Sequence, residues 1–527
     1  MSTLQNPAIE LQSNMAECFG EELHDLDQTL WDMFRSTAEQ HPDRDAVMSI
    51  WQPQGHLRNL TGNQAAPGSV NMMRWSYADL LAAAELVTSW LERQGCAAGQ
   101  RLVVFLWNST EWALFFWVAA RLRMTYIPLD PRNMDQSAEE YLELLQPSVL
   151  VVQDEAAAIN FEKACSRLKD VKIRISCTKS TPDSWTSLCD LSSATHSTTI
   201  QELTSQHMPV KRNSSGQDLA LIVFTSGTTS TPKGCCHTAA NLWSQSHDFD
   251  PETEPNLFDK WLIHTPVSHI FAINNALRTW RYGGSIVFAS KSFDINMSLK
   301  ALKRHRCTRM SAVPTLVQAL LSHPEWDNEK ESLALRYVSL SGTLIKGEDI
   351  KMCKRLGSDT VMQAYGMSEG APISSDKRVD PRLLSVDYPG VGKVLAGARL
   401  RICELGSQTT LNRNVPGELH IGGTSVIAGY LNDANPESFY TDEYGSWLRT
   451  GDQALIDDNG VLQILGRYKD LIIRGGENIS PANIESHMGQ IPGLLVSIHY
   501  QRNSCLWPIK CYPGSEKNNQ IVRTKRR

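Results

Sequence analysis

The residues best suited to chemistry follow a short apolar run in the segment Leu221–Gly234, LIVFTSGTTSTPKG. Consecutive apolar residues of this kind predict a buried parallel strand. The polar residues that come next offer hydroxyl and backbone N–H groups that can surround a polyphosphate. These residues are Thr225, Ser226, Gly227, Thr228 and Thr229, and Lys233 adds a positive charge at the end. We expect a phosphate-binding loop, with a flexible Ser/Thr/Gly loop as the alternative.

The loop differs from the phosphate loop of P-loop NTPases. That loop requires Gly directly before the Lys and Ser or Thr directly after it. Here Pro232 precedes Lys233 and Gly234 follows it. The ordered Pro-Lys-Gly ending argues against an unstructured loop, so a different nucleotide chemistry is expected.

A second polar segment, Gln363–Gly370 with the sequence QAYGMSEG, follows the apolar pair Val361 and Met362. It places a lone carboxylate, Glu369, after a Tyr-Gly turn. Magnesium binds oxygen ligands, keeps several waters and needs only one or two carboxylates beside substrate phosphates. Glu369 could therefore hold magnesium, although a lone Glu after a turn is ordinarily only solvated.

The third region comprises Pro416–Leu431 and Trp447–Glu485. In it Asp452 can accept hydrogen bonds from ribose hydroxyls, as carboxylates do in other nucleotide sites. Arg467 carries a permanent charge that can reach ribose or phosphate oxygens. An ordinary hairpin with an acidic turn would explain only Asp457–Gly460.

In this order the three regions resemble the adenylate-forming superfamily, which contains acyl-CoA synthetases, luciferases and peptide-synthetase adenylation domains. The resemblance extends from about Trp75 to Glu485. It implies an α/β fold with a large multi-layer adenylation domain over residues 1–466, built of β-sheets flanked by helices and a small β-barrel. Residues 467–527 would form a hinge at Asp470 and an incomplete α+β C-terminal lid.

The same resemblance implies roles for single residues. Glu369 would hold magnesium, Tyr365 would pack on adenine and Ser368 would meet phosphate. Lys233, Glu369 and Thr225 would act in catalysis. The implied nucleotide site comprises Thr225, Ser226, Gly227, Thr228, Thr229, Lys233, Gly342, Thr343, Gln363, Tyr365, Gly366, Ser368, Asp452 and Arg467.

The acyl pocket implied by the resemblance is nearly neutral. It contains His269, Phe271, Ala272, Gly342 and Thr343. An Asp that would bind an α-amino group in amino-acid-activating relatives is missing near these positions, which favours a plain aliphatic or aromatic carboxylic acid. The alternative for His269 is a packed core histidine.

The implied reaction uses ATP and Mg²⁺ to turn a poorly electrophilic carboxylate into an acyl-adenylate, which a thiol then attacks. Three functions fit. The first is an acyl-CoA ligase with CoA as the thiol co-substrate. The second is an acyl-AMP ligase that loads a carrier protein, and the third is a binding paralogue without catalysis because its lid is deficient.

Two departures from the family pattern bear on activity. Ser230 stands where the family usually has Gly, which would stiffen the loop. After Glu485 the resemblance fades, and no lysine can be assigned to the lid position that reaches the reacting carboxylate. We expect slow adenylation and a poorly ordered tail after about Leu495. True divergence and a shifted reading frame are both compatible with this ending.

Composition restricts the partners. A net charge of −6 over 527 residues argues against nucleic acid or an anionic membrane as partner. The apolar stretch Trp112–Ala120, flanked by Glu111 and Arg121, is too short to span a membrane and predicts a helix of a soluble protein. Twelve scattered cysteines predict reduced thiols and a cytoplasmic protein. Two polar segments, Gln52–Met73 and Ser180–Gln217, predict surface insertions or linkers.

Overall fold

A computed structural model describes residues 14–24, 26, 28–61, 72–191, 216–225, 233–247, 255–326, 333–342, 345–358, 360–376 and 390–469. It also describes the backbone of residues 472–474, 477–479, 494–498 and 509–513. The chain divides into two compact units, Cys18–Arg399 with Ile421–Leu448, and Met1–Glu17 with Leu400–His420 and Arg449–Arg527. The predicted domain boundary between residues 466 and 467 stays a prediction.

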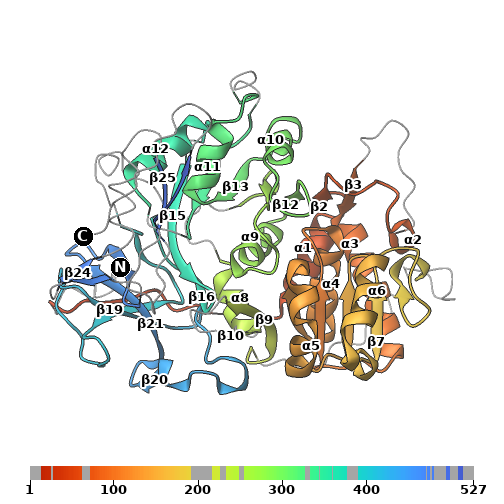
Figure 1. Cartoon of the computed structure of the whole chain (residues 1–527), viewed down its shortest axis with the longest axis horizontal. Helices are drawn as coiled ribbons and strands as arrows, with labels where there is room; N and C mark the ends of the chain where they lie inside the picture. The colour runs from red at the N-terminus through yellow and green to blue at the C-terminus, as the bar shows by residue number, and fades with distance from the viewer. Residues whose placement is uncertain are drawn as a thin grey trace, which may run out of the picture. The chain divides into compact units, whose positions relative to one another are not determined.

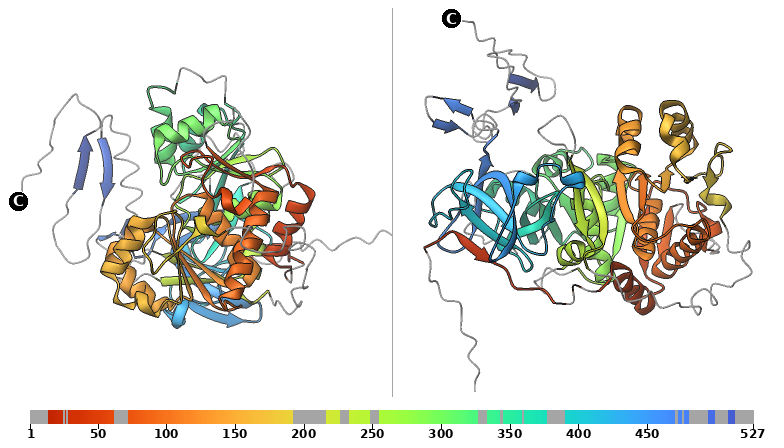
Figure 2. Two further views of the ribbon diagram at one scale, coloured as in Figure 1. Left: turned by 90° about the vertical axis from the view of Figure 1, so that its right-hand side faces the viewer. Right: turned by 90° about the horizontal axis from the view of Figure 1, so that it is seen from below.

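The first unit contains a seven-stranded sheet that is parallel except at one edge, where β10 runs antiparallel to β9. In spatial order its strands are β10 (Lys233–Thr238), β9 (Leu219–Thr225), β5 (Thr125–Leu129), β4 (Arg101–Phe105), β6 (Val149–Val152), β7 (Ile173–Ser176) and β8 (Thr186–Ser187). In both views of Figure 2 the orange segments of the chain form strands with helices packed beside them.

A nine-stranded sheet in the same unit has a parallel centre and antiparallel edges. Its strands are β17 (Lys393–Val394), β16 (Gly370–Asp376), β15 (Thr360–Met367), β14 (Tyr337–Leu340), β13 (Arg309–Ala312), β11 (Lys260–Leu262), β12 (Ser285–Phe288), β2 (Asp45–Ser49) and β3 (Met73–Ser76).

The two sheets share one layer of helices (Figure 1). Alternate residues of a strand face opposite sides, so Val104 of β4 joins the core between the sheets while Val103 joins a core on the outer side. The shared layer consists of α1 (Leu30–Gln40), α3 (Tyr77–Arg93), α4 (Thr110–Leu122) and α9 (Ile270–Arg281). The outer layers consist of α5 (Met134–Leu145) and α6 (Glu155–Ala164) on one sheet, and α10 (Ile295–Arg304), α11 (Pro314–Leu321) and α12 (Gly347–Arg355) on the other.

The remaining described α-helices are short: α2 (Arg58–Thr61) and α8 (Ala239–Gln245). A further open sheet has the order β1 (Glu17–Phe19), β18 (Arg399–Cys403), β19 (Gly417–Gly422), β21 (Gly445–Ile456) and β20 (Phe439–Asp442), with β22 (Leu462–Arg467) paired to β21. Two separate pairs are β23 (Ile472–Arg474) with β24 (Glu477–Ile479), and β25 (Leu494–Ile498) with β26 (Ile509–Pro513).

The predicted α/β class is confirmed, with mixed sheets flanked by helices. The small β-barrel was wrong for the part of the chain that is described, because the strands there form open sheets. The predicted poor order of the tail after about Leu495 stays a prediction: β25 pairs with β26, and residues 499–508 and 514–527 lie outside the described part. In the described ranges, ten cysteines are free thiols and no helix is both long and apolar enough to cross a membrane.

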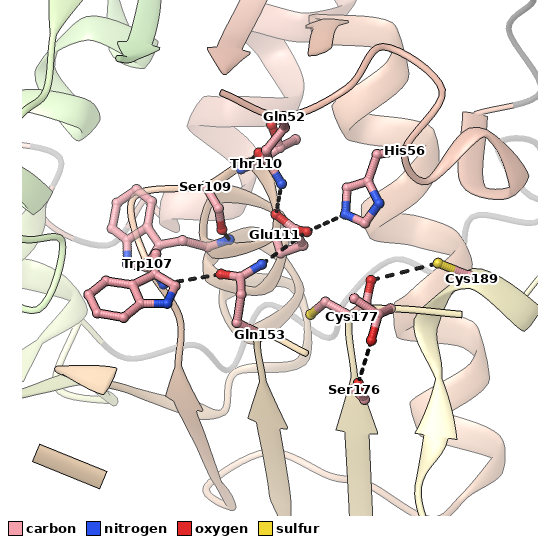
Figure 3. Close-up of polar contacts among 12 residues, drawn as sticks. Gln52, His56, Trp107, Ser109, Thr110, Glu111, Gln153, Ser176, Cys177 and Cys189 are labelled. Atoms are coloured by element: carbon pink, nitrogen blue, oxygen red, sulfur yellow. Dashed lines mark hydrogen bonds and ion pairs between the residues drawn. The ribbon is translucent and has the colours of Figure 1, made fainter. Parts of the chain in front are cut away.

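Helix α4 is apolar on nearly every side because it lies in the shared helix layer. Ser109 caps its start by accepting a hydrogen bond from the backbone N–H of Trp112. The flanking Glu111 is completely buried. Its carboxylate accepts hydrogen bonds from Gln52 at 2.7 Å and Gln153 at 3.2 Å, and it lies 2.5 Å from Nε2 of His56 (Figure 3).

Glu111 and His56 shift each other's pKa. Burial alone would raise the pKa of Glu111, but the hydrogen bond and charge of His56 hold it below the ordinary 4.5. Burial alone would lower the pKa of His56, but the Glu111 carboxylate raises it above the ordinary 6.5. The pair therefore supplies the compensating charge that a buried carboxylate needs.

These contacts also correct the predicted surface insertions. In Gln52–Met73, Gln52 and Leu60 are buried, and residues 62–71 lie outside the described part. In Ser180–Gln217, Leu188 is buried and β8 extends the seven-stranded sheet, while residues 192–215 lie outside the described part. Polar composition was misleading for Gln52 and His56 because both bind the buried carboxylate of Glu111.

Replacing His56 by Ala would leave the Glu111 carboxylate buried without its partner. We expect a loss of about 3–5 kcal/mol in the stability of this region, visible as a lower melting temperature. His323→Ala, which removes a surface histidine bonded to Asn296, is the matched control.

The effect should depend on pH. The contribution of the raised His56 pKa is complete below its unfolded value of 6.5 and is lost as pH rises through the folded value. The contribution of Glu111 is present above 4.5 and is lost as pH falls through its lowered folded value. The difference in melting temperature between wild type and His56→Ala should be largest between pH 4.5 and pH 6.5 and should shrink at higher pH. A difference that stays constant up to pH 9 would contradict a charged pair of His56 and Glu111.

Candidate functional site

The predicted phosphate loop begins and ends at paired strand positions. Strand β9 ends at Thr225 and β10 begins at Lys233, and the antiparallel register sets these two residues opposite each other. The predicted loop residues Ser226, Gly227, Thr228 and Thr229 lie outside the described residues. The backbone therefore brings the first hydroxyl of the loop and its lysine to the same edge of the sheet.

Lys233 lies over the ring of Tyr430, with Nζ 5.2 Å from the ring centroid, which is within reach of a cation–π interaction. With the Asn435 amide oriented so that its oxygen faces Lys233, that oxygen accepts a hydrogen bond from Nζ at 2.9 Å. The lysine is therefore held by the segment 424–435, which follows β19.

Glu369 lies in the turn between β15 and β16 and is 6% exposed. The hydroxyl of Tyr430 donates a hydrogen bond to its Oε1 at 2.7 Å. Burial raises the pKa of Tyr430 well above its ordinary value, and the Glu369 carboxylate raises it further. Tyr430 therefore stays protonated and donates, which joins the predicted metal residue to the predicted phosphate lysine through one side chain.

The Glu369 turn has further supports. The backbone N–H of Ile427 donates to the Glu369 carbonyl oxygen at 2.9 Å. His237 of β10 lies with Nε2 2.8 Å from the carbonyl oxygen of Ser368. Burial lowers the pKa of His237 to about 4, so at neutral pH the ring is uncharged and donates its N–H to that carbonyl.

Helix α8 also holds the segment 424–435 in place, through side-chain hydrogen bonds to its backbone. The Asn241 amide donates to the carbonyl oxygens of Thr424 at 2.9 Å and Val426 at 3.0 Å, and Gln245 donates to that of Ser425 at 2.7 Å. The segment also passes very close to Gly370, where a Cβ would lie 2.9 Å from the Ser425 carbonyl oxygen. Only glycine fits at this approach.

Beside this turn lies a pocket of about 260 Å³. One face of α9 forms a wall, because Phe271, Asn274, Asn275 and Arg278 recur at helical spacing. The lining residues are His269, Ile270, Phe271, Asn274, Asn275, Arg278, Val313, Ser339, Ser341, Gly342, Met362, Ala364, Tyr365, Gly366, Met367, Ser368, Ala371 and Pro372.

Of the predicted acyl-pocket residues, His269, Phe271 and Gly342 line this pocket. His269 is exposed at the start of α9, so it is not a packed core histidine. Ala272 was a wrong assignment to the pocket, because it faces the shared core and is fully buried there. Thr343 lies outside the described residues.

The pocket is more polar than expected. Asn274 and Asn275 contribute amides, and Arg278, which is 4% exposed, lies with its guanidinium carbon 5.9 Å from the Trp261 ring centroid. These residues were missed because they lie three to seven positions beyond Phe271. The helical spacing of polar residues on one face of an otherwise apolar helix was the signal that could have found them.

The predicted nucleotide residues fall into separate groups. Tyr365, Gly366 and Ser368 line the pocket, whereas Gln363 is buried in β15 and does not line it. In the other compact unit, Asp452 and Arg467 are register partners on β21 and β22, and Arg467 Nε lies 3.2 Å from an oxygen of Asp452. The predicted hinge residue Asp470 lies outside the described residues. These role assignments stay predictions.

A metal at Glu369 would have to take most of its ligands from elsewhere. Within the described ranges no group of three or more His, Cys, Asp or Glu side chains could hold a metal ion. Magnesium suits such a site, because it retains waters and shares substrate phosphate oxygens with one or two carboxylates. The buried carboxylate of Glu369 therefore fits magnesium bound together with a nucleotide.

Comparison with known proteins identifies the family. The family model described as AMP-binding enzyme matches residues 34–431, which is most of the chain. The chain belongs to the AMP-binding enzyme family. The match covers both large sheets and the whole pocket, and it ends one residue after Tyr430.

Single proteins that match this chain over most of its length share about a quarter of its residues. An acyl-CoA ligase of Pestalotiopsis microspora is 25% identical over 501 residues, covering 89% of this chain and 83% of its own length. A putative acyl-CoA synthetase of Bacillus subtilis is 26% identical over 484 residues, covering 89% and 84%. The structure of ATP-bound MatB from Rhodopseudomonas palustris matches with a TM-score of 0.70 at 23% identity, covering 89% and 85%, which shows the shared fold.

The buried His237 should make the protein sensitive to acid. Because its folded pKa is lowered to about 4, the unfolded chain takes up a proton first as pH falls below about 6.5, and stability declines until pH 4. His264, also buried with a pKa lowered to about 4, acts in the same direction. In His237→Gln, whose amide can still donate to Ser368, the melting temperature should fall less between pH 6.5 and 4 than in wild type. An unchanged slope, equal to that of His323→Gln, would contradict this.

Proposed function

We propose that this chain is an AMP-forming acid–thiol ligase that uses ATP to couple a compact carboxylic acid to CoA. One observation carries the proposal. A pocket with room for a compact carboxylic acid is lined by Tyr365 and Ser368. Glu369 follows Ser368 in the chain, and Tyr430 contacts both the Glu369 carboxylate and Lys233. The family and its acyl-CoA ligase members support the same reaction.

In the first half-reaction a carboxylate oxygen of the acid attacks the α-phosphorus of ATP, and the bond to pyrophosphate breaks. The charge that builds in this displacement needs positioned donors. We assign this role to Thr225 and Lys233 at the edge of the sheet, with the loop residues between them. Magnesium held by Glu369 would neutralise phosphate charge. In the second half-reaction the CoA sulfur attacks the acyl carbon and AMP leaves.

The pocket favours a small or medium acid. Its volume of about 260 Å³ lies just below the ~300–1,000 Å³ typical of pockets for drug-sized ligands. Phe271 and Met362 offer apolar contact, while Asn274, Asn275 and Arg278 make the wall formed by α9 polar. We propose an aliphatic or aromatic acid that is short enough for this space.

Lys233→Ala and Glu369→Gln should each lower acid-dependent ATP–pyrophosphate exchange by about 10²- to 10³-fold, the usual cost of removing one charge-stabilising group. The fold should stay intact. Lys351→Ala and Glu348→Gln, which remove the same charges from a surface pair 3.2 Å apart, are matched controls. Exchange at the wild-type rate in either site variant would refute its role.

The same assay separates the alternative functions. Exchange followed by thioester formation with CoA supports the ligase, and transfer only to a carrier-protein thiol supports a carrier-loading enzyme. ATP binding without exchange would instead point to a binding paralogue with a deficient lid.

Ala364→Leu should restrict the acid. Ala364 lines the pocket from β15, so a longer side chain takes space from the acyl group. We expect kcat/KM for ring-containing acids to fall by about 10- to 200-fold, since pocket fit is worth that much per methylene group. Values for two- and three-carbon acids should change little. An equal loss for all acids, measured across a length series, would count against this pocket as the acyl site.

A further inference from the structure

Tyr430 makes contacts with both groups to which the proposed function assigns phosphate chemistry. Its hydroxyl donates to Glu369 Oε1 at 2.7 Å, and the face of its ring lies 5.2 Å from Lys233 Nζ. Tyr430 is 8% exposed. A hydrogen bond to a carboxylate in such a shielded place is strong and directional.

The position of the tyrosine is fixed from several directions. Its backbone forms an isolated antiparallel bridge with Cys235 of β10. Its ring packs edge-on against Phe439, with centroids 5.4 Å apart. The segment that carries it is held by α8 through Asn241 and Gln245. The hydroxyl therefore meets Glu369 from a rigid support.

Resting on the proposed function, we propose that Tyr430 is a positioning residue that orients the Glu369 carboxylate for the metal and, through its ring, sets Lys233 beside the phosphates. Side chains that hydrogen-bond a metal ligand in this way fix its orientation, and their loss typically weakens metal affinity 10- to 100-fold. The two halves of the tyrosine then have separable effects, because the hydroxyl acts on Glu369 and the ring acts on Lys233.

The test is Tyr430→Phe, which removes the hydroxyl and keeps the ring. Mn²⁺ binding to the full chain, measured by electron paramagnetic resonance with a non-hydrolysable ATP analogue, should weaken by about 10- to 100-fold. Binding of the analogue should change little, because the ring under Lys233 remains. Tyr430→Leu should weaken both.

A matched control separates positioning from general loss of structure. Tyr77 is also buried, and its hydroxyl donates to the Gly284 carbonyl oxygen at 2.7 Å. Tyr77→Phe removes a hydrogen bond of the same length away from the site, so it should lower the melting temperature without changing Mn²⁺ affinity. An equal loss of Mn²⁺ affinity in Tyr77→Phe and Tyr430→Phe would overturn the inference.

Glu369→Gln provides the second check. If the hydroxyl acts through this carboxylate, Tyr430→Phe should cost little further Mn²⁺ affinity in the Glu369→Gln background, whereas independent effects would add and contradict the inference. Wild-type Mn²⁺ affinity in Tyr430→Phe, with exchange activity and its dependence on Glu369 intact, would overturn this inference alone. Absence of Mn²⁺ binding and of exchange in the wild-type chain would overturn the proposed function as well.

Discussion

The packing of aromatic rings between α4 and α9 is the constraint on which the pocket depends. Trp280 of α9 stacks on Trp112 of α4, with ring centroids 6.1 Å apart. The ring centroid of Trp117, also on α4, lies 5.1 Å from that of Trp280. Large rings of this kind lose much of their contact when a helix rotates or slides. The contact therefore fixes the rotation of α9, and with it the face that carries Phe271, Asn274 and Arg278 toward the pocket.

The same core explains why a carboxylate is tolerated inside the molecule. The first turn of α4 carries Glu111 into the interior, where Gln52, His56 and Gln153 satisfy it. Next to this turn, the Asn108 amide donates to the carbonyl oxygens of Ile263 and Thr265, just before the pocket residue His269. A second set of polar contacts thus ties the loop before α4 to the segment before α9.

Contiguous motifs could be predicted from the sequence, but contacts between distant segments could not. The strand that ends at Thr225 and the turn that carries Glu369 each lie within one short segment, where local composition is informative. Tyr430 lies 61 residues from Glu369, and its pairing with it depends on how the sheet edge and the segment 424–435 pack. The burial of Gln52 and His56 was missed for a related reason. Polar residues are usually exposed, and their contacts with Glu111, which lies 59 and 55 residues away in the chain, cannot be read from the local sequence.

The close approach of the segment 424–435 to Gly370 couples the evolution of two positions that lie far apart in the sequence. Because a side chain at residue 370 would meet the backbone at Ser425 and Val426, any lineage that replaced this glycine must also have displaced the segment. That displacement would move Tyr430 away from Glu369. Loss of the glycine in a descendant sequence would therefore mark the point at which the contact of Tyr430 with Glu369 had changed, whatever its other motifs retained.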